Sequence, residues 1–244
     1  GQGCLKPGMV KTTYGTGSSI MMNIGETPIL SKNGIVTSLA WGINGKVNYV
    51  LEGNINYTGA VVTWMKDDLN LIESSKETEN VAKDADQDDS VYFIPAFTGL
   101  GAPYWDSDAK AALTGVTRTT GKKEIVRSGI ECIAYQIKDI VEAMKKDTVI
   151  DMKGIRVDGG PTRNQYLMQF QSDILNMDVE VPDAEELSGI GPAYAAGMSL
   201  GLYDQSVFQK IQYNKFLPKM SENMRKKKYE GWVSAVSSTL TTQI

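Results

Sequence analysis

The chain has 244 residues, enough for one large domain or two small ones, and 41% of them are apolar, enough for a sizeable core. Its net charge of -4 provides no excess of positive charge for nucleic acid or an anionic membrane, and no apolar run approaches the roughly 20 residues that span a bilayer. Histidine is absent, which excludes Ser-His-Asp and Cys-His nucleophiles and histidine-ligated zinc within this chain.

The two cysteines, Cys4 and Cys132, do not make a disulfide framework. This cysteine usage and the lack of a recognisable signal peptide favour a reduced, cytoplasmic setting. The chain begins at Gly1 in a polar, loop-like stretch without an initiator Met, so we expect it to be part of a longer protein.

The N-terminal part of the chain predicts an antiparallel meander. Strands are expected over residues 9–14, 19–24, 36–41 and 47–51. A first glycine turn (residues 14–19, YGTGSS) joins the first two strands, and the Asn44-Gly45 pair is a hairpin signal between the last two. Apolar spacing then predicts a helix over residues 55–72 with Gly59 inside it, followed by an acidic surface helix and loop over 73–90.

The rest of the chain alternates between strand and helix patterns. The expected elements are strands over 91–97, 112–116, 154–157 and 178–181, and helices over 122–146, 163–175, 191–202 and 221–240. A second glycine turn (residues 157–164, VDGGPTRN) follows the third of these strands, with Pro161 near the first turn of the next helix. This order predicts an α/β domain with a mixed sheet, helices on both faces and ligands where loops leave the strand ends.

The two glycine turns are the sequence features that point most directly to a ligand. Each places backbone N–H groups, uncovered by side chains, at the end of a buried element, and such groups bind phosphate. Two of them in one domain predict a nucleotide held between two loops. Neither turn fits the phosphate-loop or dinucleotide fingerprint, and the alternative for the first is a plain hairpin turn.

Several stretches resemble the C-terminal half of the FGGY-type carbohydrate kinases, most specifically the glycerol kinase branch. They are KTTYGTGSSIMMNIGE, VNYVLEG, IPAFTGLGAPYWD, LTGVTR, IECIAYQIKDIVEAM, RVDGGPTRNQYLMQFQSDIL and GPAYAAG. The resemblance covers nearly the whole chain and implies a ribonuclease-H-like (actin-like ATPase) fold over residues 1–244, paired with an N-terminal substrate domain absent from this chain. It also implies ATP in the cleft between the two domains, Mg²⁺ on its phosphates and transfer of the γ-phosphoryl group to a small polyol or sugar.

The resemblance also assigns roles to residues of the first glycine turn and of the helix expected after it. It places Thr16, flanked by Gly15 and Gly17, against the nucleotide phosphates. It also places Gly59 near the phosphate and ribose, and the use of Gly there, which costs about 1 kcal/mol relative to Ala in a helix, agrees with a close approach. Packing against another element explains Gly59 equally well. The next family position that contacts the nucleotide, often Gln, is Thr63 here.

In the second glycine turn the resemblance assigns the adenosine contacts to Gly160 and Asn164. We expect Gly160 to adopt a positive φ, which a β-branched side chain would resist. The alternatives for Asn164 are a helix cap and an exposed polar residue.

Two departures from the family pattern bear on catalysis and substrate. The family's catalytic base is an Asp in a Gly-Asp-Gln-Gln motif that is expected upstream of Gly1, so this chain is predicted to contain no catalytic residue and, alone, to be inactive. Ser19 stands where glycerol kinases usually have Phe, which predicts a substrate pocket for glycerol or for a longer polyol or ketose, as in xylulokinases. A non-catalytic actin-like nucleotide-binding module is the alternative from another class, although the TGLGAPYWD loop favours a kinase. The sequence leaves a homo-oligomer open.

Overall fold

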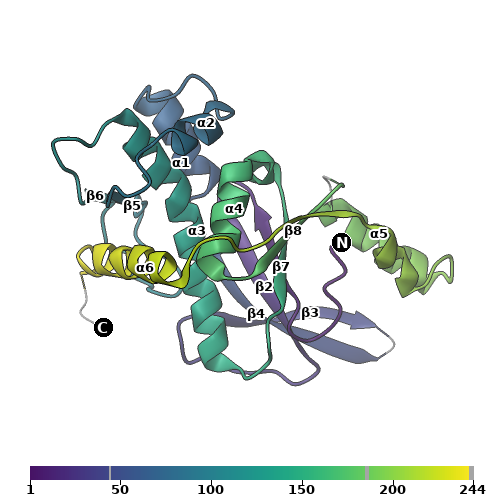
Figure 1. Cartoon of the computed structure of the whole chain (residues 1–244). Coiled ribbons are helices and arrows are strands. Elements are labelled where there is room, and N and C mark those ends of the chain that lie inside the picture. The colour runs from purple at the N-terminus through teal and green to yellow at the C-terminus, as the bar shows by residue number, and fades with distance from the viewer. Residues whose placement is uncertain (44, 185–186, 242–244) are drawn as a thin grey trace.

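The computed structural model describes residues 1–43, 45–184 and 187–241. Its centre is a seven-stranded mixed sheet with the strand order β3-β4-β2-β1-β7-β8-β9 (Figure 1). The strands are β1 (Val10–Tyr14), β2 (Ser18–Gly25), β3 (Val36–Ile43), β4 (Lys46–Ile55), β7 (Gly154–Asp158), β8 (Asp178–Pro182) and β9 (Tyr213–Phe216). A separate hairpin pairs β5 (Tyr92–Ile94) with β6 (Ala112–Thr114).

The predicted antiparallel strands are confirmed, but they do not form a simple meander, because β2 pairs with β4 and not with β3. β1 pairs with β2, β2 with β4, and β3 with β4, all antiparallel, and Ile43 lies opposite Lys46 in the expected hairpin, whose Asn44 is outside the described residues. β7 joins β1 in parallel, and β8 joins β7 in parallel. The carboxyl ends of β1 and β7 therefore lie side by side, and each of them leads into a glycine turn.

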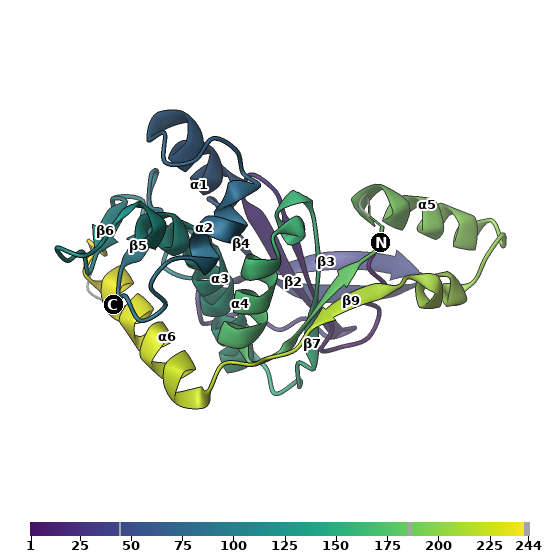
Figure 2. The same cartoon turned by 45° about the horizontal axis from the view of Figure 1, so that its top comes forward.

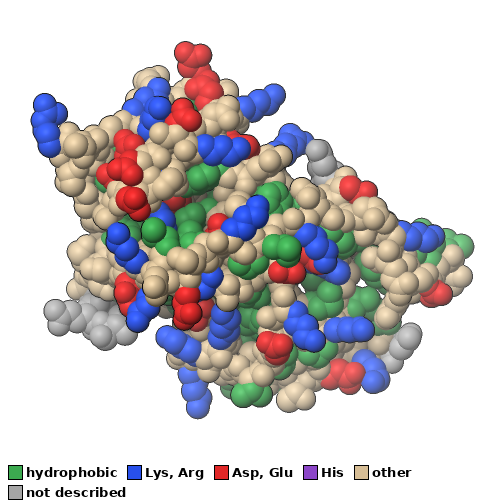
Figure 3. Space-filling model, in the orientation of Figure 1, with side chains coloured by type: hydrophobic (Ala, Val, Ile, Leu, Met, Phe, Trp, Pro, Cys, Tyr) green, Lys and Arg blue, Asp and Glu red, His purple; other side chains and the backbone are tan. Residues whose placement is uncertain are grey.

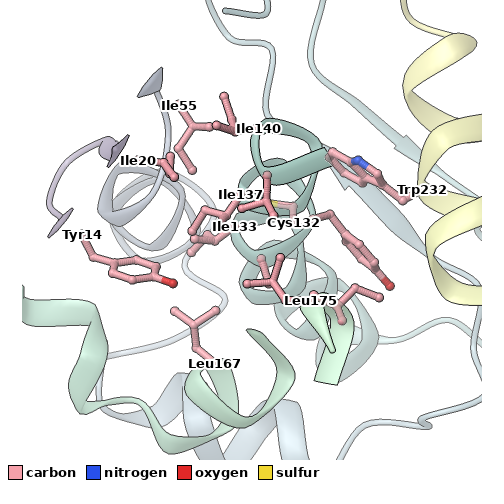
Figure 4. Packing of buried hydrophobic residues seen from close by; sticks show 14 of the residues in the cluster. Tyr14, Ile20, Ile55, Cys132, Ile133, Ile137, Ile140, Leu167, Leu175 and Trp232 are labelled. Atoms are coloured by element: carbon pink, nitrogen blue, oxygen red, sulfur yellow. The ribbon is translucent and has the colours of Figure 1, made fainter. Parts of the chain in front are cut away.

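One face of the sheet is covered by the helices α3 (Lys122–Asp147) and α4 (Gln165–Leu175). Figure 4 shows Ile133 and Ile137 of α3 between the sheet residues Tyr14 and Ile20 and residues of α4. The Tyr14 hydroxyl donates to Gln171 Oε1 at 3.0 Å, so the one polar atom of this ring is paired inside the core. This apolar layer holds β1, and with it the first glycine turn, in a fixed position.

The other face of the sheet carries α5 (Leu187–Ser199), whose residues line a cavity together with Lys11, Thr13 and Met21. Because side chains alternate along a strand, these residues of β1 and β2 point away from α3 and α4. Figure 2 shows α5 beside the N-terminus and apart from those two helices. The prediction of a mixed sheet with helices on both faces is therefore confirmed.

The prediction of one helix over residues 55–72 is wrong. β4 continues to Ile55, which pairs with Ser18, and a short helix α1 (Gly59–Thr63) begins after it and continues as a π-helical turn (Trp64–Asp68). Apolar residues 61, 62 and 65 do follow a helical spacing, and Ile55 matched that spacing although its neighbours belong to the strand pattern.

α2 (Glu77–Lys83) and α6 (Glu222–Ser237) lie within their predicted ranges. Two 3₁₀ segments, Gly160–Arg163 and Gln205–Lys210, were not predicted. α5 begins at Leu187 rather than residue 191 and contains Pro192. Strand β9 was not predicted, because its four residues YNKF show no apolar alternation. None of the helices in the described ranges is both long and apolar enough to cross a bilayer.

Candidate nucleotide-binding site

The first glycine turn is tight because its flanking residues are paired. Tyr14 lies opposite Ser18, and the Gly15 N–H donates to the Gly17 carbonyl at 2.7 Å. Gly15 and Thr16 are exposed at the tip. A Cβ on Gly17 would lie 2.4 Å from the Ile55 carbonyl oxygen, so this position accepts glycine alone.

The same turn holds the start of α1. The Gly15 carbonyl accepts from the Gly59 N–H at 3.0 Å, and the Thr16 carbonyl accepts from the N–H groups of Thr58 at 2.8 Å and Ala60 at 3.2 Å. A Cβ on Gly59 would lie 2.9 Å from the Gly15 oxygen. The packing explanation for Gly59 is therefore sufficient, and its contact with a nucleotide stays a prediction.

Thr63 ends α1 one helical turn beyond Gly59. Residues four apart share a helix face, so both face the same side of α1. The Thr63 side chain is exposed. The structure thus puts it within the neighbourhood of the first glycine turn without showing what it binds.

The second glycine turn differs from its prediction in one respect. The positive φ, +100°, belongs to Gly159 and not to Gly160. A Cβ on Gly159 would lie 1.9 Å from the Tyr14 carbonyl oxygen, so this glycine lets the two turns touch. A Cβ on Gly160 would meet no atom of the described chain within 4 Å. Gly160 therefore borders open space, as a residue that a ligand approaches closely must.

Asn164 is the N-cap of α4, so the helix-cap alternative is confirmed. Its Oδ1 accepts from the Leu167 N–H at 2.9 Å, and its Nδ2 donates to Thr78 Oγ1 at 3.0 Å. The side chain thus fixes the end of the second glycine turn and ties α4 to α2. A contact between Asn164 and adenosine stays a prediction.

Each glycine turn borders a hollow. The hollow at the second turn has a volume of about 460 Å³ and includes Gly160, Thr162 and Asn214 in its lining. The hollow at the first turn has about 500 Å³ and includes Gly15 and Ser19. Both volumes fall within the range of small-molecule sites. Because the turns follow adjacent parallel strands, the two hollows lie at one edge of the sheet, as expected for a nucleotide that spans both.

Ser19 lies on β2 opposite Thr13 of β1 and Asn54 of β4. Its Oγ is buried and has no hydrogen-bond partner in the part of the chain that the structure describes. The structure therefore brings Ser19 to the hollow at the first turn with its hydroxyl unpaired. Its role toward a substrate stays a prediction.

The sequence reasoning did not single out Asp158. This residue ends β7, is 6% exposed and carries an Oδ1 atom that no described residue pairs. Its register partner is Thr13, so it lies between the two glycine turns. The signal that was available is its place directly before Gly159 at the carboxyl end of a buried strand.

The fold is that of a known class of proteins. Over residues 10–200 the chain matches the FGGY family of carbohydrate kinases, C-terminal domain, and it belongs to that family.

Within the family, the chain is similar to glycerol kinases. It is 48% identical over 242 residues to a glycerol kinase of Natranaerobius thermophilus, covering 98% of this chain and 49% of that protein. It is 46% identical over 242 residues to one of Staphylococcus haemolyticus, covering 98% and 48%. The chain spans about half the length of these relatives.

Solved structures agree with this placement. The Plasmodium falciparum glycerol kinase with ADP superposes with a TM-score of 0.91 at 36% identity, covering 100% of this chain and 49% of that one. A ligand-bound xylulose kinase from Lactobacillus acidophilus gives a TM-score of 0.82 at 20% identity, covering 97% and 49%, and shows the common fold. The predicted fold class is thereby confirmed.

Proposed function

We propose that this chain is the nucleotide-binding half of an ATP-dependent polyol or sugar kinase that transfers the γ-phosphoryl group of ATP to an acceptor hydroxyl. The observation that carries the proposal is the pair of glycine turns in contact at the ends of adjacent parallel strands, with open space at Gly160. The similarity to glycerol kinases supports the reaction class. Residues 1–244 act as one domain, and an N-terminal half of the same protein completes the cleft.

The residues of this chain hold the nucleotide in position for the reaction. Phosphoryl transfer depends mainly on holding the reactants and on stabilising the charge of the phosphates. The backbone at Thr16 and Gly17 holds the phosphate end of the nucleotide, and Gly160, with Asn164 fixing its turn, lies against the adenosine. Mg²⁺, when bound with the nucleotide, would neutralise phosphate charge. The proton of the acceptor hydroxyl is taken by a group outside this chain.

A second candidate, a kinase for a polyol or ketose longer than glycerol, is favoured by Ser19. A small side chain with an unpaired, buried hydroxyl enlarges the pocket and offers a hydrogen bond to an additional substrate hydroxyl.

The proposed cellular location of the enzyme is the cytoplasm, in keeping with its cysteine usage.

The test is an ATP-dependent phosphorylation assay of the full-length protein with glycerol and with four- and five-carbon polyols and ketoses. We expect turnover with at least one of them. A matched Gly160→Val variant controls for contaminating kinases, since it should lose turnover while remaining folded. If the folded protein binds ADP but phosphorylates no polyol or sugar, the kinase proposal is wrong.

A further inference from the structure

The start of α4, which directly follows the second glycine turn, is held by side chains of α2. Asn164 Nδ2 donates to Thr78 Oγ1 at 3.0 Å, and the Gln165 N–H donates to Glu79 Oε2 at 2.9 Å. The first N–H groups of a helix have no partner within the helix, so the contact with Glu79 also satisfies a free donor. Both contacts fix the direction in which the chain leaves the glycine turn.

The two side chains of α2 are themselves oriented by their neighbours. Thr78 is 2% exposed, and its hydroxyl donates to the Ser75 carbonyl at 2.6 Å, which leaves its oxygen free to accept from Asn164. Glu79 pairs through Oε1 with Lys83 Nζ at 2.5 Å, so Oε2 is the atom that accepts from α4. The hydrogen bonds from Lys83 and from the main chain of α4 lower the pKa of Glu79 below its ordinary value. Glu79 is therefore a carboxylate at neutral pH.

A third contact anchors the start of α4 to α3. The Tyr166 hydroxyl donates to Glu131 Oε1 at 2.7 Å. Glu131 is 2% exposed, and its Oε1 lies 3.8 Å from both Arg127 Nε and Lys228 Nζ, so its charge is balanced inside the protein. The three consecutive residues 164–166 are thus each held by another helix.

These contacts lie behind the space that a ligand would enter. Gly160, Thr162 and Gln165 are among the residues that line the hollow at the second glycine turn, and no residue of α2 is in that lining. Figure 3 shows acidic and basic side chains interspersed over the part of the surface formed by α1 and α2, so this face offers no uniformly basic patch to phosphate. The effect of α2 on a ligand in the hollow is therefore indirect.

We propose that Thr78 and Glu79 are positioning residues of the nucleotide site. They act through Asn164 and Gln165 and keep the second glycine turn in the conformation that receives the adenosine end of the nucleotide. A turn that is free to move loses conformational entropy on binding, which weakens affinity. This assignment rests on the nucleotide binding in the proposed function and adds α2 to the elements that determine nucleotide affinity.

The experiment uses the full-length protein and two pairs of variants. Thr78→Val removes the hydroxyl that Asn164 contacts, and Thr78→Ser keeps it. Glu79→Leu removes the acceptor of the Gln165 N–H, and Glu79→Gln keeps an oxygen for it. Calorimetry gives the Kd for ADP, and steady-state assays with an acceptor that the wild type phosphorylates give the KM for ATP and kcat.

We expect Thr78→Val and Glu79→Leu to raise the ADP Kd and the ATP KM about fivefold, the effect of losing one hydrogen bond. Thr78→Ser and Glu79→Gln should restore both quantities to within about twofold of the wild type. The value of kcat should change by less than about twofold in all four variants, because neither residue touches the acceptor or the transferred phosphate.

The matched control is Ser172→Ala, at the other end of α4. The buried Ser172 hydroxyl lies within hydrogen-bond distance of the Met177 and Phe216 carbonyls, at 2.8 and 2.9 Å. Its loss should lower the melting temperature without raising the ADP Kd. Weaker ADP binding in Ser172→Ala, equal to that in Thr78→Val, would show a general loss of stability in α4 and would overturn the assignment.

The assignment and the proposed function fail in different ways. Unchanged ADP Kd and ATP KM in folded Thr78→Val and Glu79→Leu would overturn the assignment and leave the kinase proposal standing. A wild-type protein that binds no ADP would overturn both. If Thr78→Val does not fold, Glu79→Leu decides, since the Glu79 side chain is 24% exposed and its replacement leaves no buried gap.

Discussion

Gly159 and Gly160 are neighbours with different physical requirements. Gly159 has φ +100° and no room for a Cβ beside the Tyr14 carbonyl, whereas Gly160 faces open space. Gly159 is therefore needed by the fold, and Gly160 is free to serve a ligand. Substitutions at the two positions separate stability from binding.

We predict that Gly160→Val weakens ADP binding by more than tenfold, about 1.4 kcal/mol, because its side chain enters the space next to the second glycine turn. The melting temperature should change little, since no described atom lies within 4 Å of the new Cβ. Calorimetric titration and thermal unfolding measure the two effects. Gly159→Ala is the comparison and should lower the melting temperature clearly. Unchanged ADP affinity in folded Gly160→Val would show that this turn is structural only.

At Ser19 we predict a change of specificity. In the full-length protein, Ser19→Phe should shift the ratio of kcat/KM from four- and five-carbon polyols toward glycerol, because the ring removes pocket volume and the hydroxyl that pairs with a substrate hydroxyl. A site that hydrogen-bonds a substrate hydroxyl discriminates strongly against analogues that lack it. The measurement is that ratio in wild type and variant, with Ser19→Ala to separate volume from hydrogen bonding. A wild type that uses glycerol alone, with a ratio unmoved by Ser19→Phe, contradicts the prediction.

At the scale of elements, α6 is joined to α3 through one buried carboxylate. Asp139 of α3 accepts from Trp232 Nε1 and from the Tyr229 hydroxyl, each at 2.8 Å. Burial raises the pKa of Asp139 to about 6, although these two hydrogen bonds oppose the rise. The indole of Trp232 also stacks on Tyr135, with ring centroids 5.2 Å apart.

This geometry predicts a pH-dependent contribution to stability. The folded pKa of Asp139, about 6, exceeds its unfolded value of 3.8, so the folded state binds the proton more tightly. The stabilisation is complete below pH 3.8 and is lost as the pH rises through about 6. The free energy of unfolding of wild type relative to Asp139→Asn should therefore fall between pH 4 and pH 7, by at most roughly 3 kcal/mol. Denaturant titrations at several pH values measure this difference, and a difference independent of pH contradicts the assignment.

The elements that could be predicted from the sequence are those with a sustained local pattern. The 26 residues of α3 and the alternating strands β1 and β2 have one, and all three elements lie where expected. The predicted helix over 55–72 failed because the pairing of Ile55 with Ser18 overrides a spacing that fits both strand and helix. Edge strand β9 is defined by its pairing with β8, which leaves no local signal.

The basic run in α6 shows the same limit. A run of four basic residues such as 225–228 is typical of a solvated helix face, but Arg225 Nε donates to the Asp173 carbonyl at 2.8 Å and Lys228 is buried. In the candidate site, the sequence and the resemblance indicated both turns, but the division of roles between Gly159 and Gly160 depends on the distance to Tyr14. The unpaired state of Asp158 likewise depends on contacts that no local pattern contains.

At the scale of the whole molecule, the chain contains both glycine turns but spans about half the length of the curated relatives it matches. We predict that the isolated 244-residue chain binds ADP weakly and shows no measurable kinase turnover, because under the proposed function the other half of the protein supplies part of the cleft and the base. Calorimetry and a coupled assay with glycerol and longer polyols measure the two properties. The full-length protein is the positive control, and turnover by the purified chain alone would contradict the prediction.

The contact between Gly159 and Tyr14 bears on the conformational entropy that the two turns would lose when a nucleotide binds. A loop that is disordered before binding loses conformational entropy when a ligand arrives, and this loss weakens affinity. Here the second turn rests on the backbone of β1, and the first turn is tied by three hydrogen bonds to the start of α1. The two turns therefore form one preorganised unit, which would lose little further conformational entropy when a nucleotide binds. Under the proposed function, a nucleotide would therefore meet both turns already in place.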